Sequence, residues 1–120
     1  MEPVQIMKTA CTLLAIAALG GLAMAGMRFA GTPHPPAWLA VAHGFAAGAA
    51  ATLLLYAYFT VGLPSIAAWG LLLFIIAALG GIYLNLNYHM KQQPLPIGIM
   101  IVHATIAVVG FVLLVVAIIA

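Results

Sequence analysis

The sequence repeats itself after 60 residues, and this repeat limits what the chain can fold into more than any other feature. Pro36 and His43 recur as Pro96 and His103, each time a proline followed by a long apolar run with one histidine in it. A histidine inside such a run is costly in a membrane unless something binds it. The fold must therefore contain the same unit twice, with its histidine in equivalent positions.

A second match strengthens the repeat. Residues 17–21 read AALGG and recur unchanged as residues 77–81. Both copies lie in the first apolar segment of their unit, whereas both histidines lie in the second segment. The repeat therefore covers the whole unit, and we expect a single domain, residues 1–120, made of two units over about 1–60 and 61–120.

The composition places this domain in a membrane. The chain is 68% hydrophobic and 3% charged, whereas about a quarter of the residues in a soluble domain are charged. Three Lys or Arg residues and one acidic residue cannot cover a soluble surface, so we expect an integral membrane protein surrounded by lipid. The few cations form no basic cluster, which excludes a nucleic-acid partner.

Four apolar segments are each long enough to span a bilayer as a helix. They run over residues 9–30, 37–60, 65–88 and 95–119. Short breaks rich in Pro and Gly separate them, so sequence neighbours should be antiparallel, and Ser65 is the expected N-cap of the third helix. We predict an all-α membrane protein, a four-transmembrane-helix bundle built from two repeated two-helix units with pseudo-twofold symmetry along the membrane normal.

In this topology both termini lie on one side of the membrane, called side A, and the first and third loops lie on side B. Lys8 falls on side A, and Arg28 and Lys91 fall on side B. The excess of one cation on side B favours the cytoplasm for that side and a non-cytoplasmic location for the termini.

The repeat puts His43 and His103 at equal depth, about 10 Å inside side B. Burial of a polar ring in hydrocarbon favours inward orientation, so we expect the two rings to face each other across the axis. Small residues lie beside them on all four helices, at Ala47, Ala107, Gly20, Gly21, Gly80 and Gly81. Gly and Ala also serve plain helix packing in membranes, but packing alone does not explain the paired histidines.

Two facing imidazoles in a bundle core can hold the iron of one heme b as axial ligands. The small residues would make room for the ring, and Arg28, Lys91 and His89 are candidate partners for its propionates at side B. Each ligand imidazole also needs a partner for its second nitrogen, and the carbonyls of Leu39 and Ile99, one turn earlier, are the expected acceptors.

Other interpretations of the two histidines remain open. They could hydrogen-bond helices together, each could face a partner subunit, or they could hold copper or zinc. A copper or zinc site would need a third ligand, and His89 lies near the surface. The chain could then be a heme-free structural subunit of a larger membrane complex, or a small channel with a histidine proton relay.

With His43, His103 and their small neighbours, the chain resembles small four-helix membrane b-type cytochromes. It is also similar to small proteobacterial membrane proteins that carry a His-Gly pair, here His43-Gly44, and Pro-x-Pro before a histidine, here Pro94-Leu95-Pro96 before His103. The resemblance implies electron transfer through bound iron in a bacterial inner membrane, with a quinol or quinone, a larger redox complex or a homo-oligomer as partners. Diheme cytochromes also carry ligands on the opposite side, where this chain has no histidine, so we expect one bis-histidine heme.

No pair of side chains suggests acid-base catalysis, because the one carboxylate side chain, Glu2, lies in the N-terminal tail. Any enzymatic activity would therefore be oxidoreductase chemistry on a quinol or a similar redox substrate.

Overall fold

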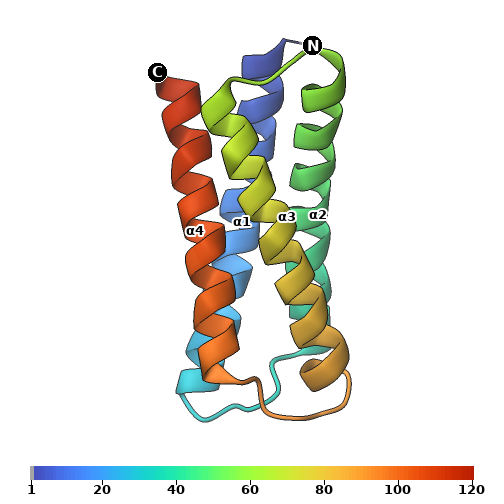
Figure 1. Ribbon diagram of the computed structural model, residues 1–120. Coiled ribbons are helices and arrows are strands. Elements are labelled where there is room, and N and C mark those ends of the chain that lie inside the picture. The colour runs from blue at the N-terminus through green and yellow to red at the C-terminus, as the bar shows by residue number, and fades with distance from the viewer. Residues whose placement is uncertain (1) are drawn as a thin grey trace.

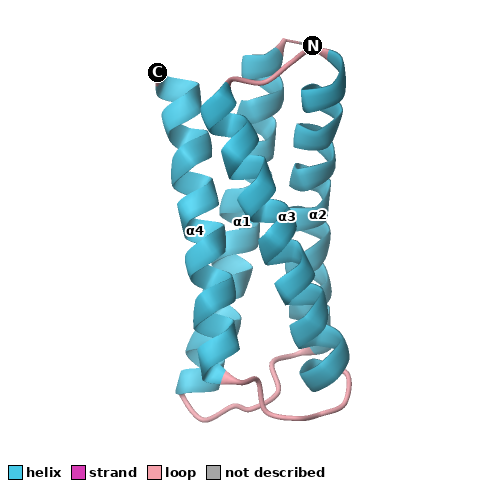
Figure 2. Cartoon of the chain, viewed as in Figure 1, coloured by secondary structure: helices cyan, strands magenta, loops and turns pink. Residues whose placement is uncertain are grey.

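The computed structural model describes residues 2–120, which form an up-and-down bundle of four antiparallel helices with both termini at one end (Figure 1). The described residues are helical except for the chain ends and three short connections (Figure 2). This arrangement confirms the predicted fold class. The helices are α1 (Pro3–Phe29), α2 (Ala37–Thr60), α3 (Ser65–Leu84) and α4 (Ile97–Ile119), and a π-helical turn, η1 (Asn85–His89), continues α3.

All four helices are long and apolar enough to cross a membrane. The bundle is 43 Å long, which exceeds the roughly 30 Å of a bilayer's hydrocarbon core. The protein is therefore an integral membrane protein by the length and composition of its helices, as its composition predicted.

Two helix starts and one helix cap differ from the prediction. Helix α1 begins at Pro3, six residues earlier than expected, because Glu2 and Gln5 form a capping box in which the Glu2 N–H donates to Gln5 Oε1 at 3.1 Å. The prediction that Ser65 caps α3 was wrong: extended Pro64 is the N-cap and Ser65 is already helical. Helix α4 begins at Ile97 rather than Leu95. Leu95 precedes Pro96, and the proline ring disfavours helical backbone angles in the residue before it.

The two units pack as two helical hairpins, α1–α2 and α3–α4, and contacts within each hairpin are more extensive than contacts between them. Small residues lie between the two helices of each hairpin, and those of the second hairpin are 60 positions after those of the first. Ala10 and Ala50 are completely buried in the first hairpin, and Gly70 and Gly110 take their places in the second. A Cβ on Gly70 would lie 3.0 Å from the Gly110 carbonyl oxygen, so α3 and α4 meet backbone to backbone.

The buried apolar core that joins the hairpins lies in the half of the bundle nearer side A. Its members are Met7, Ala10, Leu14, Ala50, Leu54, Ala67, Leu71, Phe74, Leu114 and Ala117. In the half nearer side B, the histidines and the glycines beside them are only half-buried. The side B half also contains buried apolar residues, which lie outside this cluster: Leu39, Leu84, Leu95 and Met100.

The turn η1 shifts the repeat by one residue. Such a π-helical turn adds a residue to a helix and is closed by a bond over five residues, here from the Met90 N–H to the Asn85 carbonyl at 2.8 Å. Up to Leu84, each residue of the second unit lies 60 positions after its equivalent. Beyond η1 the equivalent lies 61 positions later.

Backbone geometry at the two helix ends shows this shift. The Gly31 N–H donates to the Arg28 carbonyl, and the Gln92 N–H donates to the His89 carbonyl 61 residues later. Gly31 and Gln92 also share the left-handed backbone conformation, with φ of 100° and 53°. Pro35 follows Arg28 by seven positions, whereas Leu95 follows His89 by six, so the 60-residue spacing returns at Leu95.

Candidate functional site

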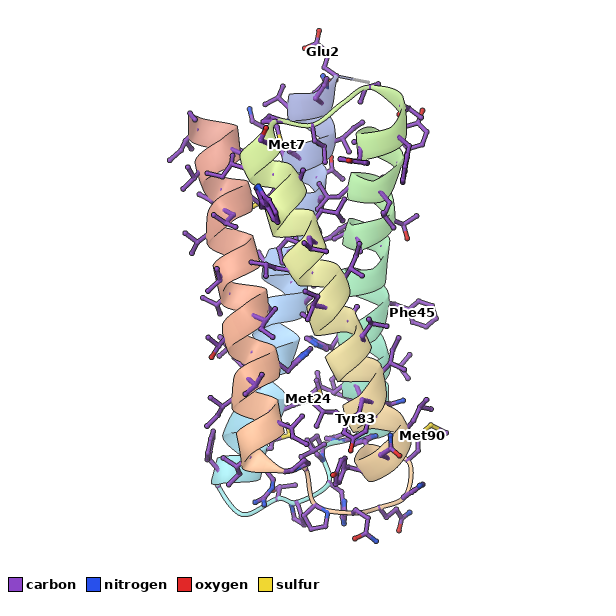
Figure 3. The ribbon with its side chains drawn as sticks, viewed as in Figure 1. Glu2, Met7, Met24, Phe45, Tyr83 and Met90 are labelled. Atoms are coloured by element: carbon purple, nitrogen blue, oxygen red, sulfur yellow. The ribbon has the colours of Figure 1, made fainter. Side chains whose placement is uncertain are left out.

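His43 on α2 and His103 on α4 face each other inside the side B half of the bundle. Their ring centroids lie 6.3 Å apart, and the ring planes are inclined by 70°. Phe45, two residues after His43, points outward from the bundle (Figure 3), as expected for the opposite face of the helix. Helix α2 therefore turns His43 toward the interior of the bundle and Phe45 away from it.

Each imidazole is fixed by a hydrogen bond to the other helix of its own hairpin. His43 Nδ1 lies 2.6 Å from the Ala17 carbonyl oxygen, and His103 Nδ1 lies 2.8 Å from that of Ala77, each acceptor 26 residues earlier in the chain. A carbonyl oxygen only accepts, so Nδ1 carries the proton and Nε2 of the neutral ring keeps a free lone pair. The bond thus selects the tautomer that a metal ligand requires.

The expected acceptors, the carbonyls of Leu39 and Ile99, were wrong. A carbonyl one turn back in the same helix already accepts a backbone N–H and lies along the helix axis. The imidazoles instead cross to α1 and α3, where each reaches the carbonyl at the start of the repeated AALGG segment.

The glycines of that segment allow this approach. A Cβ on Gly21 would lie 3.0 Å from His43 Cε1, and a Cβ on Gly81 would lie 3.1 Å from His103 Cε1. A Cβ on Gly20 would lie 3.9 Å from His43 Nδ1, and a Cβ on Gly80 would lie 3.7 Å from His103 Nδ1. The four glycines therefore lie at the depth of the histidines, as predicted, and each pair admits the imidazole of its own hairpin.

The remaining predicted small residues lie one turn deeper than the histidines. Ala47 and Ala107 are both half-buried. The walls of the bundle at and below the imidazoles thus carry little side-chain volume.

His43 and His103 are the side chains that could hold a metal between the two hairpins, and their ring centroids lie 6.3 Å apart. The Nδ1 bonds to Ala17 and Ala77 leave both Nε2 lone pairs available as ligands.

Three or more His, Cys, Asp or Glu side chains do not gather around a possible metal position anywhere in residues 2–120. His43 and His103 therefore form a two-ligand set, whereas structural zinc sites use four protein ligands. A metal bound by this pair would have to obtain its remaining ligands from outside the side chains of residues 2–120.

The three predicted propionate partners lie at the side B end but in different settings. Arg28, at the end of α1, donates from Nε to the Leu95 carbonyl at 2.9 Å. His89, at the end of η1, donates from Nε2 to the Pro35 carbonyl at 2.6 Å. Lys91 is exposed in the following loop. Arg28 and His89 thus bind backbone carbonyls of the opposite hairpin, contacts that the sequence does not indicate.

The chain was compared with known protein families, with curated proteins and with solved structures, and none of them matched.

Proposed function

We propose that this chain is a membrane-embedded electron-transfer protein that holds one heme b between His43 and His103. The observation that carries the proposal is the pair of facing imidazoles, 6.3 Å apart between centroids, each fixed through Nδ1 by a backbone carbonyl. Heme iron held in this way accepts and releases single electrons.

The chain supplies ligands, orientation and room. The Ala17 and Ala77 carbonyls hold the Nδ1 protons of the two imidazoles, which fixes ring orientation and raises the basicity of each Nε2 atom. Gly21 and Gly81 allow the rings to reach those carbonyls. Arg28 uses one of its five N–H donors on Leu95, so the others, with Lys91, remain for propionates at side B.

Electrons enter and leave at side B in this proposal. His103 lies six residues after the first residue of α4, or about 9 Å along the helix. The donor or acceptor is a quinol or quinone, or a redox partner docked at that end, in a bacterial inner membrane. Assembly into a larger redox complex or a homo-oligomer would place such a partner beside the loops, and any enzymatic turnover would be quinol oxidoreduction.

An absorption spectrum tests the proposal. Protein purified from heme-replete cells should show a Soret band and the low-spin spectrum of bis-histidine heme. His43→Asn is the sharpest variant, because the asparagine amide can still donate near the Nδ1 position while it has no group at the Nε2 position. We expect His43→Asn to fold as the unchanged chain does and to lose heme. A colourless, well-folded unchanged protein would refute the proposal.

One observation favours a second candidate, a heme-free structural subunit of a larger membrane complex. The bonds from His43 to Ala17 and from His103 to Ala77 each join two helices. Joining helices is by itself a structural role that can explain a half-buried imidazole in a membrane bundle. In that case the unchanged protein is colourless, and His43→Asn and His103→Asn retain its stability. If the heme proposal holds, the unchanged protein is coloured by heme and the two asparagine variants are not.

A further inference from the structure

Two side-chain hydrogen bonds cross between the hairpins at side B, and together we call them the two clasps. Arg28 at the end of α1 donates to the Leu95 carbonyl, in the loop before α4. His89 at the end of η1 donates to the Pro35 carbonyl, in the loop before α2. In each hairpin, a side chain at the end of the first helical segment donates to the other hairpin. A carbonyl in the loop before the second helix accepts from the other hairpin.

The repeat makes the two clasps copies of one bond. The acceptors, Pro35 and Leu95, lie 60 residues apart, are both buried, and each precedes the proline before a helix. The donors, Arg28 and His89, lie 61 residues apart, which is the spacing that η1 introduces at the end of α3. Without that extra residue, Tyr88 rather than His89 would occupy the position of Arg28. The π-helical turn η1 thus places a hydrogen-bond donor, His89, at the position equivalent to Arg28.

The two clasps lie where they can control the separation of the two hairpins at side B. The apolar core that joins the hairpins lies toward side A, and the histidines lie toward side B, between that core and the clasps. Because His43 belongs to one hairpin and His103 to the other, the distance between their rings depends on how far the hairpins separate at side B. The core fixes this separation at one end of the bundle, and the clasps can fix it at the other.

We propose that Arg28 and His89 are positioning residues, whose clasps set the separation of the two hairpins at side B and so hold the His43 and His103 rings at ligand spacing. The inference rests on the proposed function for its purpose, because ring spacing matters only if both rings bind one metal. The separation itself can be measured without any heme. Arg28 then acts chiefly through Leu95, and His89 acts through Pro35 rather than on a propionate.

The experiment measures distances between pairs of spin labels by pulsed electron resonance, in a Cys11→Ser background. Labels at Val41→Cys and Ile101→Cys report side B, because these equivalent, exposed residues lie two positions before the histidines. Labels at Tyr56→Cys and Val116→Cys are likewise equivalent and exposed, and report side A. Both pairs are measured in heme-depleted protein and again in protein from heme-replete cells.

We expect Arg28→Ala and His89→Ala each to shift the side B distances to longer values with a broader distribution, while side A distances stay unchanged. The two substitutions together should shift the side B pair further than either does alone. His89→Gln should restore the original side B distances, because the glutamine amide can donate near the Nε2 position. His34→Ala, a histidine substitution in the exposed loop, should leave both pairs unchanged.

Three results would overturn the inference. The first is an unchanged side B distribution in both alanine variants. The second is an equal change at both sides, which would make these residues general supports of the fold. The third is a His34→Ala shift as large as that of His89→Ala. A colourless unchanged protein whose side B distances still respond would refute the heme proposal while leaving the clasps intact, so the two failures can be told apart.

Discussion

The His43 and His103 side chains occupy equivalent positions in the two units of the repeat, and each donates its Nδ1 proton to a carbonyl 26 residues earlier. Their surroundings match as well, since a glycine lies against each Cε1 atom. A cofactor between them would therefore meet two nearly identical ligands, one from each hairpin. Because the two sites are equivalent, loss of either histidine should have a similar effect.

We expect His43→Ala and His103→Ala to lose heme to a similar extent, with most of the bound heme absent from each. Either change removes one of the two equivalent proposed ligands, whereas His34→Ala changes an exposed residue in the first side B loop and should retain heme. Heme content per protein, measured from the spectrum of the reduced protein, checks this. Full retention in either ligand variant would assign the ligand to another residue.

Gly21→Ala and Gly81→Ala should lower heme content without unfolding the protein. The new Cβ would stand 3.0 Å and 3.1 Å from the imidazole Cε1 atoms, so each ring must move away from its carbonyl partner. Gly26→Ala is the matched control, because its Cβ would meet no atom within 4 Å among the described residues. Replacing that helical glycine should leave heme in place and stabilise the helix by about 0.5–1 kcal/mol. Equal heme content in all three variants would show that the glycines do not position the rings.

Gly70→Ala should destabilise the bundle by about 1–3 kcal/mol, the usual cost of overpacking. Its Cβ would lie 3.0 Å from the Gly110 carbonyl oxygen, and backbone cannot move aside as a flexible side chain can. Gly48→Ala adds the same methyl group where no described atom lies within 4 Å, and should not destabilise. Unfolding of both variants in detergent mixtures, followed by helix content, measures the difference. Equal stability would mean that α3 and α4 can separate at little cost.

In sealed vesicles of known orientation, a reductant that cannot cross the membrane should reduce the heme rapidly from side B alone. Both ligands lie near side B, and most of a hydrocarbon core roughly 30 Å thick separates them from side A. The rate of the spectral change after addition to each face checks the prediction. Rapid reduction from side A alone would contradict both the electron path and the location of the heme.

The number of spans, the repeat and the depth of the histidines could all be predicted from the sequence. Long apolar runs between proline and glycine breaks leave few alternatives in a membrane, because only helices satisfy every backbone group there. An even number of spans per unit then fixes the parallel orientation of the two units, and the same number of residues from Pro36 to His43 as from Pro96 to His103 fixes equal depth. The heme itself remains a prediction.

Only the tertiary structure decided which groups the polar side chains bind. A helix surrounded by lipid is apolar on all sides, so its sequence has no polar stripe to indicate which face meets which neighbour. The partners of His43 and His103 were therefore placed in the wrong helix, although the shared 26-residue spacing to Ala17 and Ala77 lies within the repeat. Likewise, the sequence places Arg28 and Tyr88 in register, and only the extra residue of η1 brings His89 to the position from which it binds Pro35. Contacts between hairpins depend on such local helix geometry, which residue spacing alone does not determine.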